Sequence, residues 1–207
     1  MRFLARLFSI LLHPAWMPTI ILVLAYSVDP YLSFRFTSVQ LLILYGMVLC
    51  MTGLLPVMST TVMARGGLVG SIALPARQDR IVPYFMTLLY YAGAYYLLSR
   101  TTEHPVTLSL FFGGILALLL TLLITLKWKI SAHMVGIGGL VGALLGLVYV
   151  HDVYMPLLLA ISFIAAGVLG TARLLDSDHT PAQIYAGVLL GVCCAFGCIR
   201  YGILVRI

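Results

Sequence analysis

Long apolar runs alternate with short polar segments along this chain, and each run has about the length of a membrane-spanning helix. We place seven runs, at roughly residues 7–28, 38–62, 83–98, 107–126, 133–150, 154–171 and 184–204. A helix of about 20 apolar residues crosses the hydrocarbon core of a bilayer. Backbone that is exposed to lipid must satisfy its own hydrogen bonds, so every run is expected to be helical.

Prolines and glycines refine this picture. Pro14 and Pro18 interrupt the first run, which is therefore expected to be kinked or partly interfacial. A stripe of glycines at four-residue spacing lets two helices approach closely. Two runs carry such a stripe, at Gly138, Gly142, Gly146, Gly187 and Gly191. The stripe favours packing inside the bundle, and the alternative that it leaves open is a homodimer through these glycine-rich faces.

The composition places the chain in a membrane. Of 207 residues, 62% are hydrophobic and 9% are charged, whereas about a quarter of the residues of a soluble domain are charged. We expect an all-α integral membrane protein, a helical bundle of six or seven transmembrane helices that forms one domain over residues 1–207. The net charge of +6 fits contacts with membrane lipids. Nucleic acid is not expected as a partner, because no basic run alternates with aromatic residues.

Three polar segments carry most of the chemistry: residues 63–82, 127–132 and 172–183. Two apolar runs separate each segment from the next, and an even number of crossings returns the chain to the same face. All three segments are therefore expected on one side of the membrane. The loops on the opposite side show no comparable gathering of polar residues. Three further histidines are expected to be interfacial: His13, His104 and His151.

Arginines in these segments suit the recognition of a phosphate group. A planar guanidinium binds two oxygens of one phosphate, and phosphoryl transfer depends on donors that neutralise charge on those oxygens. Arg77, Arg80 and Arg173 are the candidates. Ser131 lies near the expected start of the fifth helix, where its hydroxyl or nearby amides can donate to the same group.

Two histidines supply the remaining chemistry. His133 opens the fifth helix, and His179 precedes Thr180 and Pro181, where the last helix is expected to begin. One imidazole can attack phosphorus and form a phospho-histidine, while the other protonates the leaving alcohol. Gln183 follows His179 by one helical turn and can hydrogen-bond the ring nitrogen that does not attack. These three residues are the candidate catalytic groups. No carboxylate cluster for magnesium is visible, so neither a metal nor another cofactor is expected.

The motifs formed by these residues resemble those of a known family over residues 75–200. The most specific match is Arg173, five residues, His179, three residues and Gln183; the second is Ile130–His133, and the weakest is Arg77–Pro83. At these positions the chain resembles the type-2 phosphatidic acid phosphatase family of integral-membrane lipid phosphatases.

The resemblance implies metal-independent hydrolysis of a lipid phosphate or diphosphate, with a phospho-histidine on His179 and with His133 as the general acid. The phosphate ligands that it implies are Arg173, Arg80, Arg77 and Ser131. Gln183 stands where the family has the aspartate that orients the nucleophile. This departure motivates the alternative that the protein is a catalytically silent relative, which binds or carries an anionic lipid.

A transporter is disfavoured, because the ionisable residues gather at the ends of the runs and not at mid-depth. The compactness of the chain suggests a bacterial inner membrane. The face that holds the motifs is left open. Eight Lys and Arg residues lie on the motif side and four on the other, but five remain against four once Arg77, Arg80 and Arg173 are set aside for catalysis.

Overall fold

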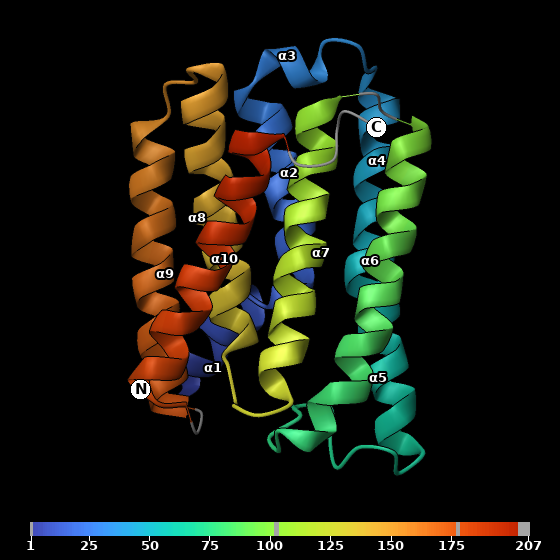
Figure 1. The fold of residues 1–207 in the computed structure, drawn as a ribbon, viewed down its shortest axis with the longest axis vertical. Coiled ribbons are helices and arrows are strands. Elements are labelled where there is room, and N and C mark those ends of the chain that lie inside the picture. Colours follow the sequence, from blue (N-terminus) through green and yellow to red (C-terminus); the bar gives the residue numbers. More distant parts are fainter. Residues whose placement is uncertain (1, 102–103, 177–178, 203–207) are drawn as a thin grey trace.

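The computed structural model describes residues 2–101, 104–176 and 179–202, and all regular structure in these ranges is helical. Figure 1 shows an elongated bundle whose long helices run side by side. The elements are α1 (Arg2–Leu11), η1 (Pro14–Trp16), α2 (Met17–Val28), α3 (Pro30–Ser33), α4 (Ser38–Leu49), η2 (Cys50–Leu54), α5 (Leu55–Arg65), η3 (Gln78–Arg80), α6 (Ile81–Thr101), α7 (Pro105–Thr125), α8 (Ala132–His151), α9 (Pro156–Asp176) and α10 (Pro181–Tyr201).

Seven helical segments in the described ranges are long and apolar enough to cross a membrane. They correspond one to one with the seven expected runs, and the all-α membrane bundle is confirmed. The third segment begins earlier than its run, because the single turn η3 leads directly into α6. This extension places Arg80 at the start of a long helix.

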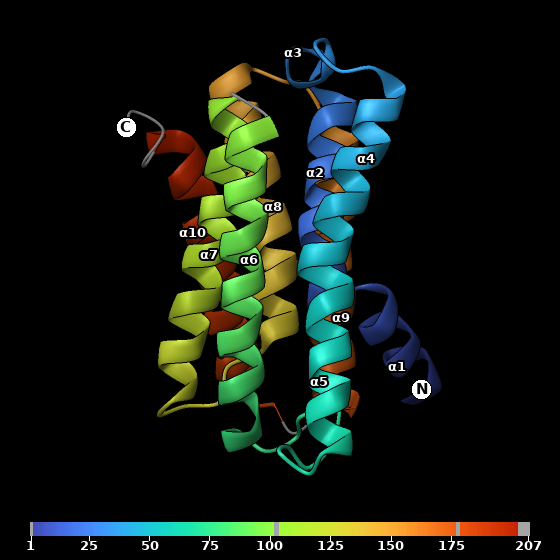
Figure 2. The same ribbon diagram turned by 90° about the vertical axis from the view of Figure 1, so that its right-hand side faces the viewer.

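The first apolar run is broken, as its prolines predict. α1 ends at Leu11 and α2 begins at Met17, with the short 3-10 turn η1 between them. The Nδ1 atom of His13 caps η1 by accepting the Ala15 amide at 3.2 Å, and Pro14 takes the first helical position, where its missing N–H costs nothing. Figure 2 shows α1 projecting to one side of the bundle at the end that holds the N-terminus, and there it packs against α9.

A π-helical turn in the second span makes room for η1. η2 separates α4 from α5 just before Pro56, whose ring cannot continue the regular hydrogen-bond ladder. Gly53 in this turn lies against η1: a Cβ added there would be 3.2 Å from the Ala15 carbonyl oxygen and from the Trp16 ring. The two irregular turns therefore pack directly on each other.

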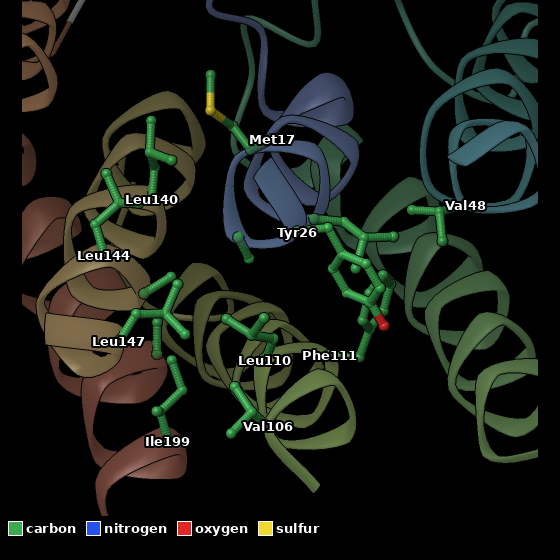
Figure 3. Packing of buried hydrophobic residues seen from close by; sticks show 14 of the residues in the cluster. Met17, Tyr26, Val48, Val106, Leu110, Phe111, Leu140, Leu144, Leu147 and Ile199 are labelled. Carbon is green, nitrogen blue, oxygen red and sulfur yellow. The ribbon is translucent and has the colours of Figure 1, made fainter. Parts of the chain in front are cut away.

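Helix α8 is the most enclosed of the seven spans. Its leucines Leu144 and Leu147 are fully buried. Figure 3 shows them with Leu110 of α7 and Ile199 of α10 in one apolar cluster. Burial of each such side chain contributes roughly 1.5–3 kcal/mol in water. Inside a bilayer, close packing and not water exclusion supplies most of the attraction.

The glycine stripes of α8 and α10 face each other. A Cβ on Gly138 would lie 2.4 Å from the Val188 carbonyl oxygen, and one on Gly191 would lie 2.1 Å from the Val135 carbonyl oxygen. Backbone thus meets backbone, and the expectation that the stripe packs inside the bundle is met. Homodimerisation stays a prediction, and the five glycines predicted to mediate it are already engaged within the chain.

The three polar connections lie at one end of the bundle. Figure 1 shows the α5–α6 and α7–α8 connections, the end of α9 and the start of α10 at the end where the N-terminus lies. This is the arrangement that the even number of crossings predicts. Because α8 and α10 both start there and run parallel, the N-termini of two long helices open at the same face.

Candidate functional site

His179 and Gln183 form a hydrogen-bonded pair at the start of α10. The His179 Nδ1 atom lies 2.9 Å from the Gln183 Oε1 atom. The same oxygen accepts the Thr180 backbone N–H at 3.2 Å. An amide N–H only donates, so the shared side-chain atom is the oxygen of Gln183, and the His179 Nδ1 must carry a proton. The neutral imidazole therefore has its lone pair on Nε2.

His179 is neutral at physiological pH. Burial lowers its pKa from 6.5 to about 4; the bond to Gln183 raises the pKa, while Arg80, Arg173 and Lys129 lower it. Only 7% of the residue is exposed. A buried imidazole among three cations disfavours further positive charge, so the ring is held in the form that can attack an electrophile.

This shift predicts that wild-type protein loses stability relative to His179→Asn as the pH falls from about 6.5 to about 4. In that window the unfolded chain binds a proton at His179 and the folded protein does not, so stability rises with pH. The contribution is complete above pH 6.5. We expect its loss to be on the order of 2 kcal/mol, because water at the membrane face screens part of the shift. Thermal unfolding of both proteins in detergent micelles at several pH values measures it, and a pH-independent difference would contradict the buried, neutral imidazole.

Ser131 joins the start of α8 to the start of α10. Its amide donates to the Gln183 carbonyl oxygen at 3.5 Å. The Ser131 hydroxyl is completely buried and has no hydrogen-bond partner among the described residues. A buried hydroxyl of this kind normally finds a partner. It lies where two helix N-termini offer partial positive charge, which is the setting in which proteins bind anions.

Arg80, the last residue of η3, closes the site next to the start of α6. Its side chain is buried, its Nε donates to the Leu74 carbonyl oxygen at 2.8 Å, and its Nη1 donates to the Ile130 carbonyl oxygen at 3.3 Å. Tyr84, one turn further along α6, is hydrogen-bonded to the Arg80 side chain and lies near Arg173. The four-residue spacing of Arg80 and Tyr84 was the available signal for this pair, and the sequence reading missed it.

Arg173 and His133 approach the same residue of α1. The Arg173 Nη1 atom donates to the Ser9 hydroxyl at 3.4 Å, and the His133 Nε2 atom lies 3.1 Å from the Ser9 carbonyl oxygen. A carbonyl oxygen only accepts, so the His133 Nε2 carries a proton. His133 also has His179 among its electrostatic neighbours. Both side chains therefore present donors at this face, and their predicted roles towards phosphate stay predictions.

Arg77 does not join this group. Its Nη1 donates to the Thr125 carbonyl oxygen at 2.9 Å and also to the Leu126 carbonyl oxygen. The guanidinium thus caps the C-terminal end of α7, where cations are favoured by the helix dipole. The expected phosphate contact of Arg77 is replaced by this structural one, because the turn η3 directs only Arg80 into the site.

Two groupings of histidines were not expected from the sequence. The ring of His13, a residue expected to be interfacial, meets the His133 ring edge to face, with the centroids 5.0 Å apart. On the opposite face, the Nδ1 atom of His151 is hydrogen-bonded to the buried Asp29 carboxylate, and the His104 and His151 ring centroids are 6.1 Å apart. Asp29, the N-cap residue at the α2–α3 turn, is the acidic member of this group. No local sequence pattern predicts the contact.

Acidic groups contribute little to the site. Asp176 is paired with Arg6 of α1 at 3.0 Å, which ties α1 to the end of α9. Asp178, the second carboxylate of this loop, lies outside the described residues. Among the described residues, no three His, Cys, Asp or Glu side chains gather closely enough to hold a metal ion. The balance of Arg80, Arg173 and Lys129 around His179 favours an anionic ligand.

Comparison with known proteins adds no identification, since no family model, curated protein or solved structure matches the chain. The integral-membrane character shown by the seven apolar spans is thus the firm conclusion about its class.

Proposed function

We propose that the protein is a lipid phosphatase of the membrane, which removes phosphate from a lipid phosphate or diphosphate through a phospho-histidine. The observation that carries the proposal is the state of His179: a buried, neutral imidazole, tied through Nδ1 to Gln183, with Arg80 and Arg173 as electrostatic neighbours. The resemblance to type-2 phosphatidic acid phosphatases points to the same residue. We also propose the inner membrane of a bacterium as its location.

In the first step, the His179 Nε2 atom attacks phosphorus. A P–N bond forms as the P–O bond to the lipid breaks, and His133, which takes up a second proton when the anionic substrate binds, gives its Nε2 proton to the leaving oxygen. Arg80, Arg173 and the Ser131 hydroxyl donate to the phosphoryl oxygens as charge redistributes over them. Each of these donors is supplied by a different element, so their convergence requires the folded bundle.

In the second step, water attacks the phosphorus of phospho-His179. His133, now neutral, takes a proton from the water as the P–N bond breaks. Inorganic phosphate leaves, and both imidazoles return to their starting protonation states. No metal enters this sequence, because the arginines and the helix N-termini carry the charge stabilisation.

An apolar cavity explains why the substrate would be a lipid. The cavity has a volume of about 100 Å³ and reaches Ala132, the residue between Ser131 and His133. Small side chains and glycines of α7, α8 and α10, among them Gly114 and Gly139, form much of its wall. A hydrocarbon chain in this cavity would extend from a phosphate bound at the α8 N-terminus towards the membrane interior.

The proposal is tested by phosphate release from a panel of lipid phosphates in detergent micelles with a chelator present. Separate His133→Ala and Arg173→Ala variants are expected to lower kcat/KM by about 10²-fold or more, since each removes one donor to the transition state. Their unfolding temperatures control for misfolding. Undiminished release by both folded variants would refute the mechanism. Tight binding of lipid phosphate by wild-type protein without turnover would instead favour the silent, lipid-binding alternative that Gln183 motivates.

Filling the cavity should affect lipid substrates selectively. Gly139 lines the cavity and a Cβ added there meets nothing within 4 Å, so the side chain of Gly139→Leu starts in open space. Displacing about two methylenes of a bound chain forfeits roughly ten contacts of about 0.1–0.2 kcal/mol each, which corresponds to a roughly tenfold loss in kcat/KM. A water-soluble phosphate monoester should be unaffected. Gly197→Leu is the matched control, because Gly197 is equally open but does not line the cavity. Equal losses for both substrates would count against the lipid-chain assignment.

A further inference from the structure

The C-terminal end of α1 and the turn that follows it form a wall of the candidate site that the family resemblance does not cover. The resemblance spans residues 75–200, whereas His13 and Ser9 belong to the first apolar run. Ser9 contacts both His133 and Arg173. Two donors that the proposed mechanism assigns to phosphate thus already point towards oxygens of this segment.

His13 enters the site in a fixed orientation. Its own backbone lies at the start of η1, and its ring packs edge to face on the His133 ring. Arg173 is a close electrostatic neighbour of His13. The third imidazole therefore adjoins the two groups that are proposed to contact phosphate and the leaving oxygen.

The tautomer of His13 follows from its cap. The Nδ1 atom accepts the Ala15 backbone N–H at 3.2 Å, so in the neutral ring the single proton lies on Nε2. With Nδ1 committed to η1, the Nε2–H is the donor that His13 can offer to a ligand. The neighbouring donors on His133 and Arg173 make an anion the fitting acceptor.

The protein holds this segment in place by close packing. A Cβ on Gly136 of α8 would lie 3.1 Å from the Met17 side chain and 3.3 Å from the Pro14 Cα atom. Gly136 lies three residues after His133 on the same helix. η1 is therefore packed tightly against the start of α8, which restricts how far the backbones that carry the two imidazoles can move apart.

We propose that His13 is a third imidazole of the site, which donates its Nε2–H to the phosphoryl group beside His133 and Arg173. The inference rests on the proposed function for the identity of the ligand. It adds a binding and catalytic group from outside the three motifs, and it explains why the first span breaks at this point of the chain. A capping role by itself would not require the ring to face His133.

The experiment separates the cap from the imidazole. Asparagine is a strong N-cap residue, so His13→Asn preserves an acceptor for the Ala15 amide and removes the Nε2 donor. His13→Ser, another strong cap, provides a second reading should the first variant fail to fold. His104→Asn is the matched control, because His104 also precedes a proline at a helix start, that of α7, but at the opposite end of the bundle.

Two measurements are made on each full-length variant in micelles: phosphate release from a lipid phosphate, and the rise in unfolding temperature caused by inorganic phosphate. We expect the capping variants to lose about 30-fold in kcat/KM and to bind inorganic phosphate at least about fivefold more weakly, with His104→Asn within threefold of wild type in both. If folded His13→Asn and His13→Ser had the kcat/KM and the phosphate affinity of wild type, the proposal would be overturned, and His13 would act only as the N-cap of η1.

The two readouts distinguish this inference from the proposed function. Wild-type protein that binds inorganic phosphate without releasing it from lipids, with weaker binding by His13→Asn, would support the role of His13 and overturn hydrolysis. Normal turnover in His13→Asn and His13→Ser would support hydrolysis and overturn the role of His13. Wild-type protein that neither binds nor releases phosphate would overturn both.

Discussion

Replacing His179 with asparagine is expected to abolish phosphate release from lipid substrates, with kcat lowered by about 10⁴-fold or more. The asparagine side-chain amide can occupy the place of Nδ1–H and keep the hydrogen bond to the Gln183 oxygen, which now measures 2.9 Å to the ring nitrogen. What the variant lacks is the Nε2 lone pair. The loss therefore reports the nucleophile itself and not the packing around it.

The measurement is single-turnover phosphate release, together with a search for acid-labile phosphate on the protein after quenching. Wild-type protein should retain labelled phosphate and His179→Asn should not. His104→Asn controls for the removal of a histidine at the opposite end of the bundle. A His179→Asn protein that still accumulates labelled phosphate would show that another group, such as His133, is the nucleophile.

The partner of His179 shapes this expectation. A carboxylate at position 183 would raise the pKa of the imidazole and stabilise the cation that forms during attack. The Gln183 amide holds the tautomer without adding negative charge, and the pKa stays at about 4. The resting nucleophile is thus fully available at neutral pH, but its developing charge must be balanced elsewhere. The phosphate itself, held by Arg80 and Arg173, is the remaining source of that balance.

The lengths of the apolar runs and the even number of crossings between the polar segments were sufficient to predict the helical bundle and the common face of these segments. Apolar run length sets the number of helices, and two crossings between polar segments set their common face. Within that frame, the spacing from His179 to Gln183 predicted a hydrogen bond that the structure contains. Such inferences succeed because they depend on helix geometry within one element or on a count of crossings, and neither requires knowledge of how helices pack.

Contacts between elements that are far apart in the sequence could not be predicted from run lengths and residue spacing. The prolines predicted a break in the first span, but its direction depends on Gly136 and Gly53, against which η1 packs. His13 reaches His133 only because of that direction. Arg77 and Arg80 look alike in the sequence, and the turn η3 sends one to the end of α7 and the other into the site. The pattern of residue types along the chain does not determine which of two similar arginines enters the site.

Substituting Gly191 by alanine should be among the most destabilising single-methyl changes in the protein. An added Cβ would lie 2.1 Å from the Val135 carbonyl oxygen and 2.6 Å from the Gly139 amide nitrogen. Both are backbone atoms of α8, so no side chain can turn aside, and the two helices must separate. Overpacking of this kind costs about 3 kcal/mol or more, which thermal unfolding in detergent micelles would reveal.

The same variant tests whether the α8–α10 contact positions the site. His133 and His179 lie at the starts of these two helices, and the contact between the glycine stripes sets their separation. Gly191→Ala should therefore lose at least about tenfold in kcat/KM even at temperatures where it remains folded, since a displacement of about 1 Å can cost as much as 10²-fold. Gly197→Ala, on the same helix with open space around its Cβ, should retain both stability and activity. Equal behaviour of the two alanine variants would mean that α8 and α10 are not in direct backbone contact, and the shared phosphate site at their N-termini would then lose its structural basis.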